Sequence, residues 1–208
     1  MADPDRPLTA LDPATVPDDP LELFLAWYAD AEAAGIPLHS NTALATATPD
    51  GRPSARIVLL KGADERGFTF YTSFQSRKAG ELDTNPRAEL LFYWNPLDRQ
   101  VRIAGHVERV DDAEADAYFA TRPRGSQLSA WASRQSEPLE SREVLERRMA
   151  EADARFPGDV PRPPGWGGYR LVPRRLEFWL SRDDRLHDRV RYERSSGNGG
   201  WTRVRLAP

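Results

Sequence analysis

Five short segments with period-two alternation follow one another between residues 41 and 110, and they restrict the fold more than any other feature of the sequence. Pro49-Asp50-Gly51, between the first two segments, is a hairpin-turn signal. Strands joined by such short turns pair in antiparallel fashion with their neighbours. The pattern therefore predicts a mainly β, α+β fold, either an antiparallel barrel or a sandwich. We expect the strands at 41–48, 54–61, 67–73, 88–94 and 100–110.

Helical spacing of apolar residues flanks these strands. Residues 20–34 carry Leu23, Phe24 and Trp27 at that spacing, and Pro20 suits the first helical turn. The apolar stripe of a longer amphipathic segment, 140–156, is interpreted as ordinary core. We also expect short helices at 76–82, 111–120 and 126–133, and closing strands at 168–181, 185–194 and 201–206.

The first nineteen residues differ from the rest of the chain. They hold four prolines and five aspartates but only one arginine, and they lack periodic apolar residues. Such a segment cannot bury enough apolar surface to order itself. We therefore expect a disordered arm at 1–19 and a single domain at 20–208.

The composition argues against several classes of function. Cysteine is absent, which excludes disulfides, thiolate metal sites and thiol catalysis. The three histidines show no H-x-x-x-H spacing, so we expect no metal site. The net charge of −3 argues against nucleic-acid binding. No apolar run approaches the roughly 20 residues of a membrane span, and no secretory signal opens the chain, so we expect a cytoplasmic protein without membrane contact.

The segment R-L-H-D-R at 185–189 suggests a ligand contact. In an extended strand, Arg185, His187 and Arg189 would point to the same face. Two guanidinium groups beside an imidazole suit a bound anion next to a titratable contact. A solvated basic edge strand would show the same pattern, and the segment alone does not decide between the two interpretations.

Other cationic and amide side chains gather at predicted strand ends and loops. They include Lys61 and Lys78, which are notable because the other 27 of the 29 basic residues are arginine. Several such clusters in an acidic chain suggest more than one bound phosphate, because arginine forks and lysine charges bind phosphate. Aromatic residues near them in sequence (Tyr71, Tyr118 and Trp166) suit a flat heterocycle.

The chain resembles the pyridoxine/pyridoxamine 5′-phosphate oxidase family. Ten short segments occur in that family's order between about residue 20 and the C-terminus. They are R-I-V-L-L-K (56–61), F-Y-T (70–72), S-R-K (76–78), R-Q-V (99–101), Y-F-x-x-R-P-R-x-S-Q (118–127), A-W-x-S-x-Q-S (130–136), W-G-G-Y-R (166–170), E-F-W (177–179), R-L-H-D-R (185–189) and R-L-A-P (205–208).

The resemblance implies an antiparallel split β-barrel with flanking helices that binds FMN at the subunit interface of a homodimer. It also implies an oxidase, a pyridoxal 5′-phosphate synthase, that acts on pyridoxine and pyridoxamine 5′-phosphates. A hydride would pass from C4′ to the flavin, and O₂ would reoxidise the flavin. The products would be pyridoxal 5′-phosphate and H₂O₂, with ammonia from the amine.

Roles for individual residues follow from the resemblance. Arg185 and His187 match the pair that lies over the pyridine ring, where a guanidinium can steady developing charge. The implied substrate set is Lys61, Tyr118, Arg122, Ser126, Arg185 and His187. The implied FMN set is Arg56, Ile57, Val58, Leu59, Leu60, Lys61, Tyr71, Thr72, Arg77, Lys78, Gln100, Gln135, Ser136, Trp166 and Arg189.

One departure from the family keeps alternatives open. Residues 1–19 lack the Arg-x-x-Tyr segment that often covers the substrate in the family. A related oxidase of the phenazine-biosynthesis type, with another substrate, and a flavin- or pyridoxal-phosphate-binding protein without turnover are therefore alternatives. The presence of Tyr118, Arg122 and Ser126 favours a phosphorylated substrate, and Arg185 with His187 favours turnover.

Overall fold

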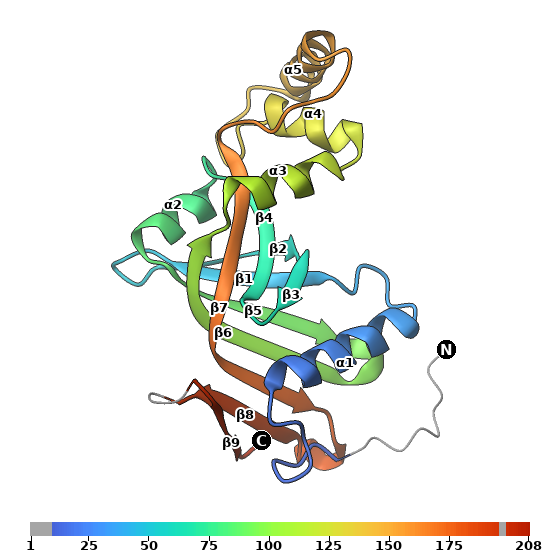
Figure 1. Ribbon diagram of the computed structural model, residues 1–208, viewed down its shortest axis with the longest axis vertical. Coiled ribbons are helices and arrows are strands. Elements are labelled where there is room, and N and C mark those ends of the chain that lie inside the picture. Colours follow the sequence, from blue (N-terminus) through green and yellow to red (C-terminus); the bar gives the residue numbers. More distant parts are fainter. Residues whose placement is uncertain (1–9, 196–198) are drawn as a thin grey trace.

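The computed structural model describes residues 10–195 and 199–208, whose strands form one strongly curled antiparallel sheet (Figure 1). The strand order is β2-β1-β5-β6-β7-β4-β3, with β8 on β7 and β9 on β8. The strands are β1 (Asn41–Ala47), β2 (Pro53–Leu59), β3 (Gly62–Asp64), β4 (Gly67–Ser73), β5 (Arg87–Trp94), β6 (Arg99–Arg109), β7 (Trp166–Leu180), β8 (Asp188–Arg194) and β9 (Trp201–Arg205). The antiparallel, mainly β fold with flanking helices is confirmed, and β3 is a strand that the sequence pattern did not indicate.

Within residues 10–195 and 199–208, five α-helices accompany the sheet. The first, α1 (Pro20–Ala33), begins where the Asp19 carboxylate accepts the Leu21 N–H at 2.9 Å, and the chain leaves it through Gly35 at a φ of +66°. Its buried Phe24 packs edge-on against Phe68, which fixes α1 on the sheet. The other helices are α2 (Arg77–Thr84), α3 (Asp112–Ala120), α4 (Arg124–Ala132) and α5 (Arg142–Arg155).

The main core lies between α1 and the inner face of the sheet. Leu44, Leu90 and Phe92 are fully buried there, and they occupy alternate positions in β1 and β5 as the period-two pattern requires. A smaller cluster, which includes Phe119 and Trp166, holds the α3–α5 region together. The two clusters divide the molecule into a sheet body and a helical end (Figure 1).

The long strand β7 connects the two ends of the molecule. Residues 166–171 of this strand pair with β4, and residues 175–180 pair with β8, while β6 follows it from Tyr169 to Leu180. Fifteen residues span up to about 45 Å when extended. In Figure 1, β7 starts beside α3–α5 and ends near β8 and the short 3₁₀ turn Asp183–Arg185.

The R-L-H-D-R segment differs from the expected strand. Arg185 ends the 3₁₀ turn with a φ of +60°, and β8 begins only at Asp188. Asp184 also has a positive φ, which aspartate tolerates better than most residues, and this favours a turn over continued strand. The prediction that Arg185 and His187 share one face of a strand with Arg189 is therefore wrong.

The predicted disordered arm also differs from the structure where it is described. Residues 1–9 lie outside the described residues, but Leu11 is only 4% exposed. The Tyr192 hydroxyl donates to the Pro17 carbonyl at 2.8 Å, and Arg205 pairs with Asp12 at 2.8 Å. Asp12 and Asp18 thus pair with Arg205 and Arg203 on β9, over a long sequence separation that local composition does not reveal.

The bulge between β6 and β7, where the pairing register shifts between Ala104 and Gly105, gives a prediction about stability. A Cβ on Gly105 would lie 2.0 Å from the Val172 carbonyl oxygen, so the Gly105→Ala variant must shift β7. We expect its free energy of unfolding to fall by about 2–3 kcal/mol in urea titrations. Gly80→Ala on α2 is the control, because a Cβ there meets nothing within 4 Å and alanine favours a helix. Equal destabilisation by the two substitutions would contradict this account.

Candidate functional site

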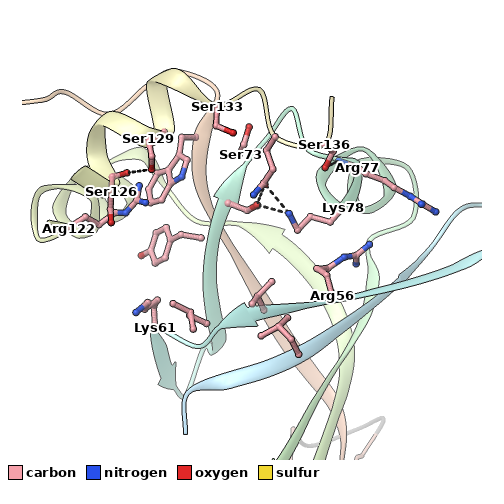
Figure 2. A pocket seen from close by; sticks show the side chains of 18 of the residues that line it. Arg56, Lys61, Ser73, Arg77, Lys78, Arg122, Ser126, Ser129, Ser133 and Ser136 are labelled. Carbon is pink, nitrogen blue, oxygen red and sulfur yellow. Dashed lines mark hydrogen bonds between the residues drawn. The ribbon is translucent and has the colours of Figure 1, made fainter. Parts of the chain in front are cut away.

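A pocket of about 1190 Å³ opens between the helical end, α2 and strand β2 (Figure 2). Its wall combines aromatic, hydroxyl and cationic side chains. Most of the predicted ligand residues line it, although they come from segments far apart in the sequence. They are Arg56, Ile57, Val58, Leu59, Lys61, Tyr71, Thr72, Arg77, Lys78, Tyr118, Arg122, Ser126, Gln135, Ser136 and Trp166.

Lys78 is a buried cation in this wall. It is 8% exposed, and its Nζ donates to Thr72 Oγ1 (3.1 Å), Ser76 Oγ (3.3 Å) and Gln135 Oε1 (3.0 Å). These acceptors are neutral, and within residues 10–195 and 199–208 no carboxylate forms an ion pair with the ammonium. Burial, and then the charge of Arg56, lower the pKa of Lys78 to about 8. An anion bound here would supply the missing opposite charge.

Two arginines lie on the same side of the pocket as Lys78 (Figure 2). Arg56 pairs with Glu81 at 3.1 Å, and Arg77 pairs with the other oxygen of Glu81 at 2.8 Å. The Ser136 hydroxyl accepts the backbone N–H of Arg77 at 3.2 Å, which brings the loop after α4 to the start of α2. Arg56, Arg77 and Lys78 together form a group that we call the α2 cradle.

A second cationic group lies across the pocket, beside α3 and α4 (Figure 2). The Arg122 guanidinium lies 4.6 Å from the centre of the Trp166 ring, and burial lowers its pKa. Its buried NH1 atom has no hydrogen-bond partner among the described residues. Ser126 and Lys61 line the same side of the pocket. We call Lys61, Arg122 and Ser126 the α4 group.

Stacked aromatic rings line the pocket beside the α4 group. The Tyr71 and Tyr118 rings stack with centres 3.9 Å apart, and Tyr71 stacks on Trp166 at 5.5 Å. Burial, followed by the charge of Glu114, raises the pKa of Tyr71 to about 12, so its phenol stays protonated at neutral pH. The pocket thus combines flat aromatic surface with two cationic groups.

Two hydrophobic details differ from the sequence interpretation. Leu60 lies outside the pocket wall and is 6% exposed, since its side chain joins the core. On α5, only Ala152 is buried, whereas Leu145 and Met149 line the pocket. The interpretation of the α5 stripe as ordinary core is therefore wrong for Leu145, whereas Met149 lines the pocket and also packs against the cluster that includes Phe119 and Trp166.

The remaining predicted ligand residues lie away from the pocket, at the far end of β7. Gln100 pairs with Trp179 across the sheet, and Trp179 pairs with Arg189. The Trp179 and His187 rings lie 4.6 Å apart, and the Arg182 N–H donates to His187 Nδ1 at 3.1 Å. Neutral His187 therefore carries its proton on Nε2. We call Gln100, Trp179, Arg185, His187 and Arg189 the β7-end group.

Sequence reasoning missed two members of these arrangements. Trp179 was not assigned a role, although strand alternation places it on one face with Glu177, whose carboxylate accepts two hydrogen bonds from Arg189 (2.7 and 3.1 Å). Glu81 was also missed. Its spacing of four residues from Arg77 on a predicted helix was the available signal.

The described residues contain neither a metal-binding cluster nor a membrane-spanning helix. No group of three or more His, Asp or Glu side chains there is arranged to hold a metal ion. No helix there is long and apolar enough to cross a membrane.

Comparison with protein families and sequences gives consistent matches. The sequence model named Pyridoxamine 5′-phosphate oxidase matches residues 29–156, and that of the Pyridoxine 5′-phosphate oxidase C-terminal dimerisation region matches 166–208. The chain is 61% identical over 191 residues to pyridoxine/pyridoxamine 5′-phosphate oxidase of Rubrobacter xylanophilus, covering 91% of this chain and 87% of the relative. It is 58% identical over 197 residues to the protein of that name from Sphingopyxis alaskensis, covering 94% and 90%.

Solved structures agree on the fold. PhzG from Burkholderia lata 383, in complex with tetrahydrophenazine-1-carboxylic acid, has a TM-score of 0.91 at 36% identity, covering 97% of this chain and 98% of that one. An FMN-binding, pyridoxamine 5′-phosphate oxidase-related protein from Nostoc punctiforme has a TM-score of 0.75 at 20% identity, covering 93% and 100%, and shows the fold alone. The predicted split-barrel fold is confirmed.

The environment of Lys78 predicts how the stability of the ligand-free protein depends on pH. Folded Lys78 releases its proton near pH 8, whereas the unfolded chain holds it to about its ordinary pKa of 10.5. Between these values the unfolded state binds more protons, so the free energy of unfolding should rise with pH. Urea titrations at pH 7.5, 8.5 and 9.5 should show a steeper rise for the wild type than for Lys78→Met.

Lys61→Met is the matched control for this prediction, because it removes the other lysine of the chain, which is exposed. It should keep the wild-type rise. Parallel pH dependence of the wild type and Lys78→Met would contradict the desolvated environment of Lys78.

Proposed function

This chain belongs to the pyridoxamine 5′-phosphate oxidase family, and from that premise we propose that it converts pyridoxine 5′-phosphate and pyridoxamine 5′-phosphate to pyridoxal 5′-phosphate. Bound FMN would supply the redox chemistry, taking a hydride from C4′ of the substrate and passing the electrons to O₂. Pyridoxine 5′-phosphate and O₂ would give pyridoxal 5′-phosphate and H₂O₂. The oxidation of pyridoxamine 5′-phosphate would also consume one water molecule and release ammonia.

The observation that carries the proposal is the presence of two separate cationic groups and stacked aromatic rings in one pocket. A substrate phosphate and a cofactor phosphate need two such groups, and both are monoester dianions that arginine and lysine bind well. We assign the FMN phosphate to the α2 cradle, because the Lys78 ammonium has only neutral partners there among the described residues. We assign the substrate phosphate to the α4 group, where Arg122 NH1 is buried without a partner in the described chain.

The residues of this chain would act by binding and positioning. Arg56, Thr72, Arg77, Lys78, Gln135 and Ser136 would hold the phosphate end of FMN. Ile57–Leu59 and Tyr71 would lie along the rest of the cofactor. Lys61, Tyr118, Arg122 and Ser126 would bind the substrate phosphate. The Arg185 guanidinium and the His187 Nε2–H would contact the pyridine ring, where fixed charge can stabilise charge that develops during hydride transfer.

We propose that the active protein is a homodimer whose pockets are each completed by the β7-end group of a second copy. The matched C-terminal region is described as a dimerisation region. In one chain the β7-end group and the pocket lie at opposite ends of a 15-residue strand. The outer face of the sheet carries Ile57 and Tyr93 at 62% and 57% exposure, and exposed apolar surface of this kind suits a subunit interface.

A second candidate is an oxidase with another substrate, because the TM-score to PhzG, an enzyme bound to tetrahydrophenazine-1-carboxylic acid, is 0.91. That compound contains no phosphate. The α4 group would then have no phosphate to bind, which is why we favour the phosphorylated vitamin. Testing both substrate types with one variant of this group separates the two candidates.

Arg122→Met tests the assignment of the substrate phosphate. Loss of a charge-assisted phosphate contact should lower kcat/KM for pyridoxine 5′-phosphate by about ten- to a hundredfold. FMN affinity should be unchanged, because the α2 cradle is intact. Arg124→Met is the control, since the Arg124 guanidinium contacts Asp153 and the Phe156 carbonyl outside the pocket. An unchanged kcat/KM in Arg122→Met, or turnover confined to a phosphate-free substrate, would contradict the proposal.

Heterodimers test the shared site. Arg122→Met disables the pocket of its own chain, and Arg185→Gln disables the β7-end group that its chain lends to the other. A purified heterodimer of the two variants, isolated with two different tags, should recover about half of wild-type activity, because one of its two sites is intact. At substrate concentrations below the wild-type KM, each homodimer should keep at most about a tenth of wild-type activity, because both of its sites are damaged. A heterodimer no more active than the homodimers would show that each site is built from a single chain.

A further inference from the structure

We propose that Glu81, which takes no part in ligand contact, is the positioning residue that organises the α2 cradle for a phosphate dianion. The inference rests on the proposed FMN site and deepens it. Glu81 lies on α2 and is 6% exposed. Among the described residues, its carboxylate is the only one that pairs with members of the cradle.

The carboxylate is held by four donors. Its Oε2 accepts from the Thr46 and Ser54 hydroxyls, both at 2.5 Å, and from Arg56 NH2 at 3.1 Å. Its Oε1 accepts from Arg77 Nε at 2.8 Å. Although burial opposes the charged form, these hydrogen bonds outweigh it and lower the pKa of Glu81 to about 2. Glu81 is therefore a fixed negative charge throughout the pH range of a working protein.

The two hydroxyls orient Arg56 through Glu81. Each hydroxyl gives its single hydrogen to Glu81, which turns an oxygen lone pair toward the guanidinium. Arg56 NH1 then donates to Thr46 Oγ1 and NH2 donates to Ser54 Oγ, both at 2.6 Å. NH1 also donates to the Leu44 carbonyl at 3.2 Å. With the bond to Glu81, all four terminal hydrogens of Arg56 have acceptors, so its charge is locked in place at the pocket wall.

Arg77 is held in a different way. It uses only Nε on Glu81, and its terminal nitrogens have no acceptor among the described residues. A guanidinium fixed through Nε keeps its two-nitrogen fork available for phosphate oxygens. Because the Arg77 side chain is 65% exposed, its rotamers would be free without this partner four residues along the helix. Glu81 thus fixes the Arg56 guanidinium in place and orients the Arg77 guanidinium with its two terminal nitrogens free to bind phosphate.

Charge balance supports the same role. Arg56, Arg77 and Lys78 carry three positive charges when Lys78 is protonated, and Glu81 removes one. The remaining charge of +2 balances the charge of a phosphate monoester dianion. Glu81 thus reduces the repulsion among the three cations in the free protein and leaves enough positive charge for the ligand. A site with no carboxylate would hold three unpaired cations, one of them the buried ammonium of Lys78.

Two effects of Glu81 oppose each other, and the hydrogen-bond network decides which dominates. The carboxylate repels a phosphate through space, but water in the open pocket screens that repulsion. Removing the carboxylate leaves two hydroxyl hydrogens and two guanidinium groups without their acceptor, and the cradle must rearrange. We therefore expect weaker phosphate binding when Glu81 is replaced.

The test compares two flavins that differ only in the phosphate. Ligand-free full-length protein is titrated with FMN and with riboflavin, and quenching of flavin fluorescence gives Kd. In Glu81→Gln the Kd for FMN should rise by about ten- to a hundredfold, with the Kd for riboflavin unchanged. Glu81→Asp keeps the charge but shortens the reach, so it should also weaken FMN binding selectively. A general loss of structure would weaken both flavins alike.

Asp83→Asn is the matched control, because Asp83 lies on the same helix and pairs with Arg109 outside the cradle. It should leave the preference for FMN over riboflavin at the wild-type value. Tighter FMN binding in Glu81→Gln, or an unchanged preference in both Glu81 variants, would overturn the role of Glu81 alone. A wild-type protein with equal affinity for the two flavins would overturn both that role and the proposed cofactor site.

Discussion

The pairing of β7 with β4, β6 and β8 is the interaction on which the rest of the structure depends. The first half of β7 joins the helical end to the sheet through β4, and the second half carries β8 and β9. The register between β7 and β6 shifts at a bulge between Ala104 and Gly105, where the absence of a side chain on Gly105 lets the two backbones approach. The strand therefore fixes both ends of the molecule relative to each other.

This geometry places complementary chemistry at the two ends. The pocket end holds cations with incomplete partners, such as Lys78, and flat aromatic rings. The far end holds Trp179, His187 and an arginine fixed by Glu177. Neither end by itself offers everything that a flavin oxidase needs, which is why we propose that each copy completes the pocket of the other with its β7-end group. The buried carboxylates Glu81 and Glu177 have parallel tasks, since each pairs with arginine that we assign to the proposed site.

Much of the fold, and the pocket end of the proposed site, could be predicted from the sequence. The period-two alternation located β1, β2, β4, β5 and β6 within one or two residues, because most of them alternate between a more buried and a more exposed face, but it missed the short β3. The pocket residues were found through short segments of the family's pattern.

The rest depends on tertiary contacts that leave little local trace. Arg185 was expected in a strand but lies in a turn, because Asp184 adopts a positive φ. Trp179 and Glu81 matter through neighbours that are remote in sequence.

The central claim is that this pocket oxidises a phosphorylated B6 vitamer through bound FMN, and a spectrum recorded without oxygen tests it most directly. The protein is loaded with FMN, mixed anaerobically with pyridoxine 5′-phosphate, and followed at the flavin absorption band. We predict that the band bleaches and then returns when air is admitted, with pyridoxal 5′-phosphate and H₂O₂ formed in equal amounts. A flavin band that stays unchanged on addition of pyridoxine 5′-phosphate would contradict the claim.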